Sequence, residues 1–442
     1  MHSSFNVNMP SFLFPGMRAI YQQLFGIYRD SNPLVISTVQ KIWQFPNPSS
    51  NEPLDYIFIY ANPGSAEEEV PEHWHYISLG LSDLYGDSRV HPVDPSASTE
   101  RVSGMGFELT FRLKRHEEVT PPSWPAQLLQ QLAKYVFLSR NKFYPGDHIP
   151  WQKPLDGNED SNIRHILIAL DCQLKKIKTI LGHVTFCQIV GVTEEELNKS
   201  QSFNVKGILD LLKKDPKTGG MSLCTDMRRM LSVFDLFPHT LKMLEDDLER
   251  EGSDLAGIDA EFFYREIPKI AIKTSLCLTM SDSEKSLDFT RHLGRLDIRT
   301  SAELNAHHSA SSPFLPFSRR MPIILDGAEI MFSPTTAKFL KLAFKDRLRH
   351  GHHFTFQNPD THLTFVSENV QGCFVSETQP YALHGKWLQI RIDKELLMTI
   401  IDSLKDLDPE RIATLPLPLV FDYPEKNLRF IVNHLSPSSM LR

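Results

Sequence analysis

The chain lacks the sequence features that mark most enzymes, membrane proteins and nucleic-acid-binding proteins. Its 442 residues contain no G-x-x-x-x-G-K-[ST] phosphate loop, no strand-linked G-x-G-x-x-G and no G-x-S-x-G nucleophile turn. No apolar run approaches the roughly 18 residues that a transmembrane helix needs. A formal net charge of -7 argues against nucleic-acid binding by phosphate neutralisation. These absences favour a protein whose partners are peptides, proteins or cationic groups.

Cysteine is also sparse. The 5 cysteines are scattered and form no C-x-x-C pair, which is typical of reduced thiols in a cytosolic or nuclear protein. The N-terminus has no basic segment ahead of its short apolar patch, so we expect no secretory signal peptide. The apolar fraction of 41% and charged fraction of 23% are those of a globular protein.

Strand and helix patterns follow one another irregularly, which predicts an α+β fold of mainly antiparallel or mixed sheets rather than a doubly wound sheet. The clearest strand is 107–114, where apolar and polar side chains alternate between two faces. A helix is predicted to start at Pro125 and to bury Leu128, Leu129, Leu132 and Val136. Thr193 and Glu196 have the spacing of a capping box at the start of another helix.

Composition divides the chain into a tail, 1–14, and two lobes, 15–262 and 263–442. A polar stretch at 281–318 has little periodicity and is predicted to be a flexible insertion in the second lobe. Its serines beside acids are either kinase targets or simply solvated. In the second lobe the predicted strands are 271–278, 323–325, 339–344, 352–356, 363–366, 387–392 and 428–432. A turn at 357–360 joins two of them as a hairpin, and Asp393 is predicted to cap a helix.

Two histidines raise the possibility of a metal-dependent enzyme. His73 and His75 lie two residues apart on a predicted strand, so both rings share one face. A zinc or iron site needs three or four ligands, and Glu72 is the nearest carboxylate. The alternative is that both rings are satisfied by hydrogen bonds at a lobe surface.

The most suggestive stretch is 135–151, where a helix ends and a Pro-Gly turn follows. The turn has a defined shape and is predicted to direct Asp147 and His148 outward. One carboxylate among aromatic side chains suggests a recognition pocket with apolar walls and one polar anchor. Its aromatic residues are Tyr135, Phe143, Tyr144 and Trp151. The alternative is a core-lining loop with a solvated aspartate.

Several strings along the chain resemble the Suppressor of fused family. They include Pro-Glu-His-Trp-His-Tyr-Ile-Ser-Leu-Gly-Leu-Ser-Asp-Leu-Tyr-Gly at 71–86 and Gly-Phe-Glu-Leu-Thr-Phe-Arg-Leu-Lys-Arg at 106–115. Further similar strings are 146–148, 188–197, 225–229, 350–355, 364–366, 380–385 and 387–390. The similarity covers nearly the whole chain in order, apart from the tail and the 281–318 segment.

This resemblance implies a non-enzymatic negative regulator of Hedgehog signalling, without a cofactor, direct nucleic-acid contact or membrane attachment. Such proteins clamp a Ser-Tyr-Gly-His-Leu strand of Gli/Ci zinc-finger transcription factors between their two lobes. They retain these factors in the cytoplasm and repress them in the nucleus. A Fused-type kinase is a further partner that the family name implies.

The family positions for peptide contact fall on Tyr135, Phe143 and Asp147 in the first lobe and on Phe339 and His350 in the second. Asp147 is expected to face the peptide histidine. One departure concerns a second-lobe acid that vertebrate members carry, because Thr335 stands at that position. Either Asp147 acts alone, or Glu329 substitutes, or the correspondence shifts by a few residues.

Overall fold

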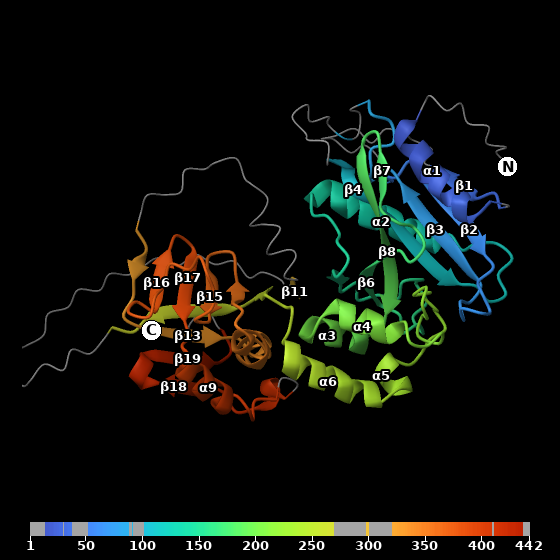
Figure 1. Cartoon of the computed structure of the whole chain (residues 1–442). Coiled ribbons are helices and arrows are strands. Elements are labelled where there is room, and N and C mark those ends of the chain that lie inside the picture. The colour runs from blue at the N-terminus through green and yellow to red at the C-terminus, as the bar shows by residue number, and fades with distance from the viewer. Residues whose placement is uncertain are drawn as a thin grey trace, which may run out of the picture. The chain divides into compact units, whose positions relative to one another are not determined.

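The computed structural model describes residues 14–29, 31–37, 52–87, 91, 101–268, 298–299, 321–408 and 411–435. The chain divides into two compact units, Met1–Leu244 and Glu245–Arg442. Each combines mixed sheets with helices (Figure 1), which confirms the predicted α+β class. The boundary predicted from the sequence lies between residues 262 and 263. The predicted strand 271–278 lies outside the described residues, as do the tail except Phe14 and the insertion except residues 298–299.

The first unit is built on one eight-stranded sheet in the order β1-β2-β3-β4-β8-β6-β5, with β7 paired to β8. Neighbouring strands are antiparallel, apart from the parallel pair β4–β8. The strands are β1 (Leu34–Ser37), β2 (Tyr56–Asn62), β3 (His73–Leu79), β4 (Val102–Lys114), β5 (His148–Ile149), β6 (His165–Leu170), β7 (Ile177–Thr179) and β8 (Gly182–Val192). The predicted strand 107–114 is therefore the second half of β4.

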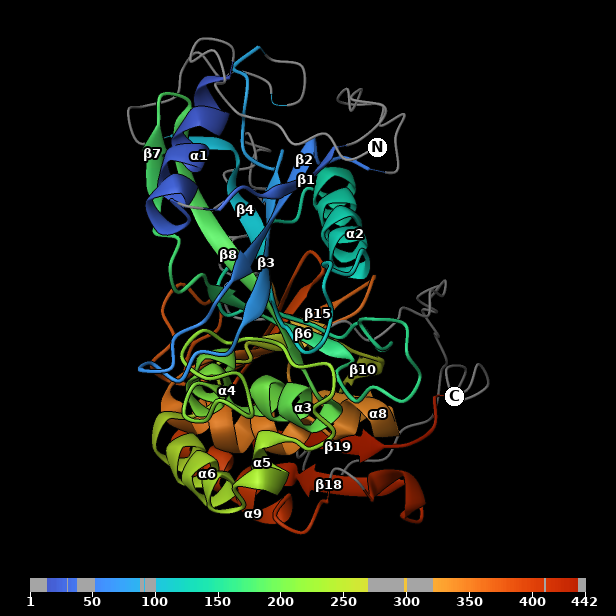
Figure 2. The ribbon, with the colours of Figure 1, turned by 90° about the vertical axis from the view of Figure 1, so that its right-hand side faces the viewer.

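Helices cover both faces of this sheet. Ile57 and Ile59 of β2 pack in the same core as α2 (Trp124–Ser139), whereas Phe58 and Tyr60 pack in the core of α1 (Pro15–Ile27). Figure 2 shows the two helices on opposite sides of the strands. The predicted apolar face of α2 is buried, as expected. Because both faces are covered, the polar side chains of β4 are also enclosed.

The remaining helices of this unit are α3 (Glu194–Ser202), α4 (Val205–Leu212), α5 (Val233–Leu236) and α6 (His239–Glu251), which continues into the second unit. The predicted capping box is confirmed at α3. The Thr193 hydroxyl accepts a hydrogen bond from the Glu196 N–H at 3.4 Å, and the Glu196 carboxylate accepts one from the Thr193 N–H at 3.0 Å.

The second unit has two sheets. One has the order β10-β13-β19-β18 and the other β11-β9-β14-β15-β17-β16-β12. The strands are β9 (Gly257–Asp259), β10 (Phe262–Glu266), β11 (Ile298–Arg299), β12 (Ile323–Ile324), β13 (Ala328–Phe332), β14 (Phe354–Gln357), β15 (His362–Val366), β16 (Tyr381–His384), β17 (Trp387–Arg391), β18 (Leu419–Tyr423) and β19 (Leu428–Val432). Phe332, Phe356 and Phe430 meet ring to ring in its core. The predicted hairpin β14–β15 is confirmed.

One predicted strand of the second unit is wrong. Residues 339–344 belong to a helical segment that runs from α8 (Pro334–Ala337) through the π-helix η1 (Leu342–Arg347) to the 3-10 helix η2 (Leu348–His350). Leu340, Ala343 and Phe344 are fully buried, a spacing of three and four residues that puts them on one side of a helix. The predicted helix after Asp393 is confirmed as α9 (Lys394–Ser403), since the Asp393 carboxylate accepts a hydrogen bond from the Leu396 N–H.

Short 3-10 turns, η3 (Ile412–Thr414) and η4 (Pro424–Lys426), flank β18. Across the ranges that the structure describes, we find no helix long and apolar enough to cross a membrane.

Candidate functional site

The stretch 135–151 of the first unit, predicted to form a recognition pocket, starts where α2 ends. Arg140 terminates the helix in the left-handed conformation at φ 66°, and its N–H donates to the Val136 carbonyl at 2.9 Å. Tyr135, on the last turn, is 46% exposed. The side-chain amide of Asn141 donates to its phenol oxygen at 3.0 Å. Asn141 was not among the predicted site residues, although an amide side chain just beyond a helix end often bonds locally. This bond fixes the orientation of an otherwise exposed ring.

The predicted Pro-Gly turn is confirmed as a closed four-residue turn. The Asp147 N–H donates to the Tyr144 carbonyl at 3.0 Å, and the Tyr144 N–H donates to the Asp147 carboxylate at 2.7 Å. Gly146 has a φ of +102°, a region that glycine adopts without the strain a side chain would bring. The Asp147 side chain is therefore held at the corner by its own turn.

The prediction that Asp147 and His148 point outward is wrong. Asp147 is only 3% exposed and His148 8%. The reason is long-range pairing, because the chain continues from the turn into β5, which pairs with β6. The Gly146 N–H donates to the Ile168 carbonyl and the Ile168 N–H to the Asp147 carbonyl, each at 2.9 Å. These bonds draw the turn onto the sheet.

Asp147 is buried rather than solvated, since only 3% of it is exposed. Burial, together with the negative charge of Asp147, raises the pKa of the Cys187 thiol to about 12. That thiol donates a long hydrogen bond of 4.0 Å to the Phe143 carbonyl. The alternative of a solvated aspartate is therefore excluded, and a buried carboxylate interacts strongly with a cation that reaches it.

Two aromatic rings form a wall beside this carboxylate. Tyr135 stacks on Phe143 with ring centroids 5.7 Å apart and an interplanar angle of 20°. Phe143 is buried and meets Phe107 of β4 edge to face at 6.4 Å. The inner ring is thus fixed by the core, and the outer ring presents its free area to solvent.

Strand β5 closes one end of the eight-stranded sheet within the part of the chain described. An edge strand beside an apolar wall and a buried anion has the chemical requirements for binding an extended peptide. Main-chain bonds supply affinity and side-chain pockets supply specificity in that mode.

The two predicted residues of the second unit lie in the helical segment after β13, Phe339 just beyond α8 and His350 at the end of the segment. Phe339 is half-buried against the core, and its N–H donates to the Thr336 carbonyl at 3.1 Å. His350 ends η2, and a Cβ at Gly252 would come within 2.8 Å of its ring. Burial, reinforced by the Arg349 cation, lowers the pKa of His350, so its imidazole is neutral at pH 7.

Thr335 and Glu329, the two residues at issue for a second-lobe acid, are both placed. Thr335 is exposed on α8 and exchanges a hydrogen bond of 2.8 Å with Ser333. Glu329 is a buried residue of β13, and its carboxylate contacts Arg265 at 2.6 Å and Arg429 at 3.3 Å. Glu329 is therefore already committed to two arginines.

The histidine pair does not form a metal site. Both rings are fully buried rather than at a lobe surface. His75 contacts the Tyr28 hydroxyl at 2.8 Å and the Asp171 carboxylate at 3.2 Å; His73 contacts the Pro71 carbonyl and an Arg112 nitrogen, each at 2.8 Å. All four ring nitrogens thus have protein partners. No group of three potential metal ligands occurs among the described residues.

Burial and the neighbouring guanidinium explain the charge state of these histidines. Burial first, and Arg112 second, lower the pKa of His73 to about 3 and that of His75 to about 4. A guanidinium in contact with a ring also disfavours a metal cation at the same place. Arg112 and Asp171 form the centre of this network, and neither was predicted from the sequence because they are 59 residues apart in the chain.

Comparison with known proteins agrees with the resemblance of the sequence strings. A family model described as "Suppressor of fused protein (SUFU)" matches residues 50–230. A second, described as "Suppressor of Fused Gli/Ci N terminal binding domain", matches residues 242–432. The human and mouse proteins named Suppressor of fused homolog are each 38% identical over 94% of this chain and 90% of their own length.

Solved structures give the same result. The chain is similar to Drosophila Suppressor of Fused, with 38% identity and a TM-score of 0.80 over 96% of this chain and 98% of that one. A chain of a structure entitled "the Sufu-Fu complex crystal structure" is 46% identical, with a TM-score of 0.50, over 53% of this chain and 99% of its own. The protein therefore belongs to the Suppressor of fused family of non-enzymatic regulators of the Hedgehog pathway.

Proposed function

We propose that this protein represses Hedgehog signalling by binding Gli/Ci transcription factors through a Ser-Tyr-Gly-His-Leu strand. It retains these factors in the cytoplasm and represses them in the nucleus. The family model that matches residues 242–432 is described by Gli/Ci binding, which supports this partner. A Fused-type kinase is a second partner, supported by the similar chain whose structure is titled as a Sufu-Fu complex.

The observation that carries the proposal is the buried carboxylate of Asp147 beside the edge strand β5. The peptide adds as a strand along β5, and its histidine donates a charge-assisted hydrogen bond to Asp147. Such a bond contributes about 1.5–3 kcal/mol. Tyr135 and Phe143 form the wall against which an apolar or aromatic side chain of the peptide packs.

The second unit contributes Phe339 and His350 to the same peptide. Phe339 is half-buried, so part of its ring is available for an apolar contact. His350 is neutral and adds no charge that opposes the peptide histidine. Because Thr335 is uncharged and Glu329 is engaged by two arginines, Asp147 acts as the single acid for the peptide histidine.

Calorimetry with the Ser-Tyr-Gly-His-Leu peptide tests this proposal. Asp147→Asn retains an acceptor for the Tyr144 N–H but removes the charge, whereas an arginine would not fit this buried position. We expect the dissociation constant to rise about tenfold or more, equivalent to about 1.4 kcal/mol. Asp160→Asn, an exposed acid in the following loop, is the matched control and should bind like the parent protein.

The pH dependence gives a second readout. Affinity for the parent protein should increase as the pH falls from 7 towards 6, because the peptide histidine becomes protonated near its ordinary pKa of about 6.5. The Asp147→Asn variant should show a weaker increase. Unchanged affinity at both pH values in this variant, with its fold intact by circular dichroism, would contradict the assignment.

A further inference from the structure

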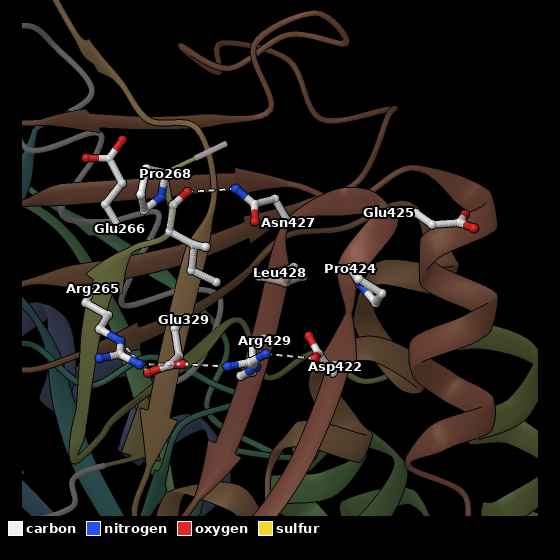
Figure 3. A pocket seen from close by; sticks show the side chains of 11 residues that line it. Arg265, Glu266, Pro268, Glu329, Asp422, Pro424, Glu425, Asn427, Leu428 and Arg429 are labelled. Carbon is white, nitrogen blue, oxygen red and sulfur yellow. Dashed lines mark hydrogen bonds and ion pairs between the residues drawn. The ribbon is translucent and has the colours of Figure 1, made fainter. Parts of the chain in front are cut away.

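A second candidate site lies on the sheet β10-β13-β19-β18 and includes none of the residues assigned to the Ser-Tyr-Gly-His-Leu peptide. A cavity of about 700 Å³ opens on this sheet (Figure 3), a volume in the range of ligand sites. Its lining includes Arg265, Glu329, Asp422, Glu425 and Arg429.

A row of alternating charges crosses all four strands beside the cavity. The register aligns Arg265 with Glu329, Glu329 with Arg429, and Arg429 with Asp422. Ion pairs follow this register, at 2.6 Å from Arg265 to Glu329, 3.3 Å from Glu329 to Arg429 and 2.8 Å from Arg429 to Asp422. Figure 3 shows the four side chains in line. The row therefore reads positive, negative, positive, negative, and it ends on Asp422 of β18.

A row of apolar side chains runs parallel to the row of charges, and on each strand the apolar residue is two positions from the charged one. Phe263 pairs with Met331, Met331 with Ile431, and Ile431 with Val420 of β18. The first three are half-buried and Val420 is 54% exposed. The opposite face of the same strands, with Ile330, Phe332, Phe430 and Val432, forms the core. Both rows therefore belong to the outer face of the sheet.

Strand β18 is the last strand in this sheet order among the described residues, so both rows terminate there. An edge strand offers a row of main-chain groups to an added strand. On such a strand the residue opposite Val420 continues the apolar row, and the residue opposite Asp422 continues the charge row. Cross-strand pairs of opposite charge and of apolar residues are the favourable ones.

The charges that line the cavity indicate which charge a binding partner should carry. The cavity is lined by two arginines, Arg265 and Arg429, and four carboxylates, Glu266, Glu329, Asp422 and Glu425. Both arginines are engaged in the row. The neighbouring Lys426 forms its ion pair, at 2.7 Å, with Asp393, which is not a lining residue. The surplus negative charge favours a cationic side chain.

We propose that β18 accepts an extended segment of a partner protein with an apolar residue and a lysine or arginine two positions apart. The apolar side chain packs beside Val420, and the cation pairs with Asp422. A further basic side chain reaches the cavity between Glu266 and Glu425, which flank it in Figure 3. A second copy of β18 does not meet this requirement, because its sequence Leu-Val-Phe-Asp-Tyr contains no basic residue.

The test uses the full chain and a fluorescent peptide in which valine and arginine alternate on one face, separated by threonines. The control peptide carries glutamate in place of arginine. We expect the arginine peptide to bind about tenfold or more tightly than the glutamate peptide, and more weakly as salt increases. Asp422→Lys should abolish this preference and increase binding of the glutamate peptide, a reversal that a merely structural role does not produce.

Asp360→Lys is the matched control, because it makes the same charge change on the exposed β14–β15 turn. It should leave the preference intact. Val420→Asp should weaken binding of the arginine peptide without restoring the glutamate peptide. Equal binding of the two peptides, or no binding of either, would overturn the proposal. The role of Asp422 would then be to prevent other strands from pairing with this sheet edge. Self-association of the parent chain that Asp422→Lys abolishes would overturn it in favour of a second copy.

Discussion

Replacing Asp171 by asparagine should destabilise the first unit strongly. The Asp171 side chain is fully enclosed and accepts hydrogen bonds from Arg112 at 2.9 Å, Thr110 at 2.8 Å and His75 at 3.2 Å. Although burial alone would raise it, the Arg112 guanidinium and His75 hold the pKa of Asp171 well below its usual range. The carboxylate is therefore the counterion of a guanidinium that is itself 0% exposed.

The magnitude follows from leaving that guanidinium without a counterion. Removing one partner of a buried ion pair costs about 3–5 kcal/mol. Asparagine keeps an oxygen for the N–H groups of Gln173 and Leu174, but its amide N–H₂ group faces donors from Arg112 or Thr110. We therefore expect a loss near the middle of this range in the free energy of unfolding.

Urea unfolding of the full chain, combined with hydrogen exchange at the amides of β4 and β8, measures this loss. Exchange assigns the effect to the first unit, since the two units need not unfold together. The double variant Arg112→Met with Asp171→Leu removes both charges and should recover most of the stability. A loss below about 1 kcal/mol for Asp171→Asn, or a double variant as unstable as the sum of its single changes, would refute the reasoning.

Three further changes test the first unit. The pKa of His75 is about 4 in the folded protein and about 6.5 in the unfolded chain, so between these pH values only the unfolded chain binds a proton at this residue. The free energy of unfolding should therefore fall by about 1.4 kcal/mol per pH unit as the pH decreases from about 6.5 to about 4. Urea titration of the parent protein and of a His75→Gln variant, which lacks this contribution, measures the difference. Glu196→Ala removes the capping box of α3 and the buried partner of Arg229, and should cost about 3–5 kcal/mol in thermal unfolding, with Glu195→Ala costing less. Gly146→Ala meets no atom within 4 Å but strains the backbone at φ +102°, so it should cost about 1–2 kcal/mol and weaken peptide binding.

The parts of the site that could be predicted are those with local causes. The Pro-Gly turn, the end of α2 and the capping box each depend on a few consecutive residues, and all three have the predicted form. The direction of Asp147 depends instead on pairing between β5 and β6, and the ladder partner Leu167 is about 20 residues further along the chain. Nothing in the Pro-Gly turn itself specifies that pairing.

The prediction of a strand in the helical segment after β13 was wrong for a related reason. Its buried residues fit helical spacing, but the segment passes from an α-helix to a π-helix and then to a 3-10 helix. Each of these has a different number of residues per turn, so no single period describes the whole run. The short apolar stretch at 339–344 on its own is compatible with either a strand or a buried helix.

Alternation of polar and apolar residues has opposite meanings in the two units. In β4 the polar face of Glu108, Thr110 and Arg112 is fully buried, because the core around α1 and the segment that carries Asp171 and Gln173 lie on that side of the sheet. Each polar group there must then find a partner inside, and Glu108 accepts hydrogen bonds from the Ser78 and Ser82 hydroxyls. In β18 the same alternation, with Asp422 exposed, marks an outer face at a sheet edge. Sequence alone does not distinguish these cases, since the difference depends on which elements cover each face. A charge on an alternating strand therefore indicates an internal network in one place and a site for a partner in the other.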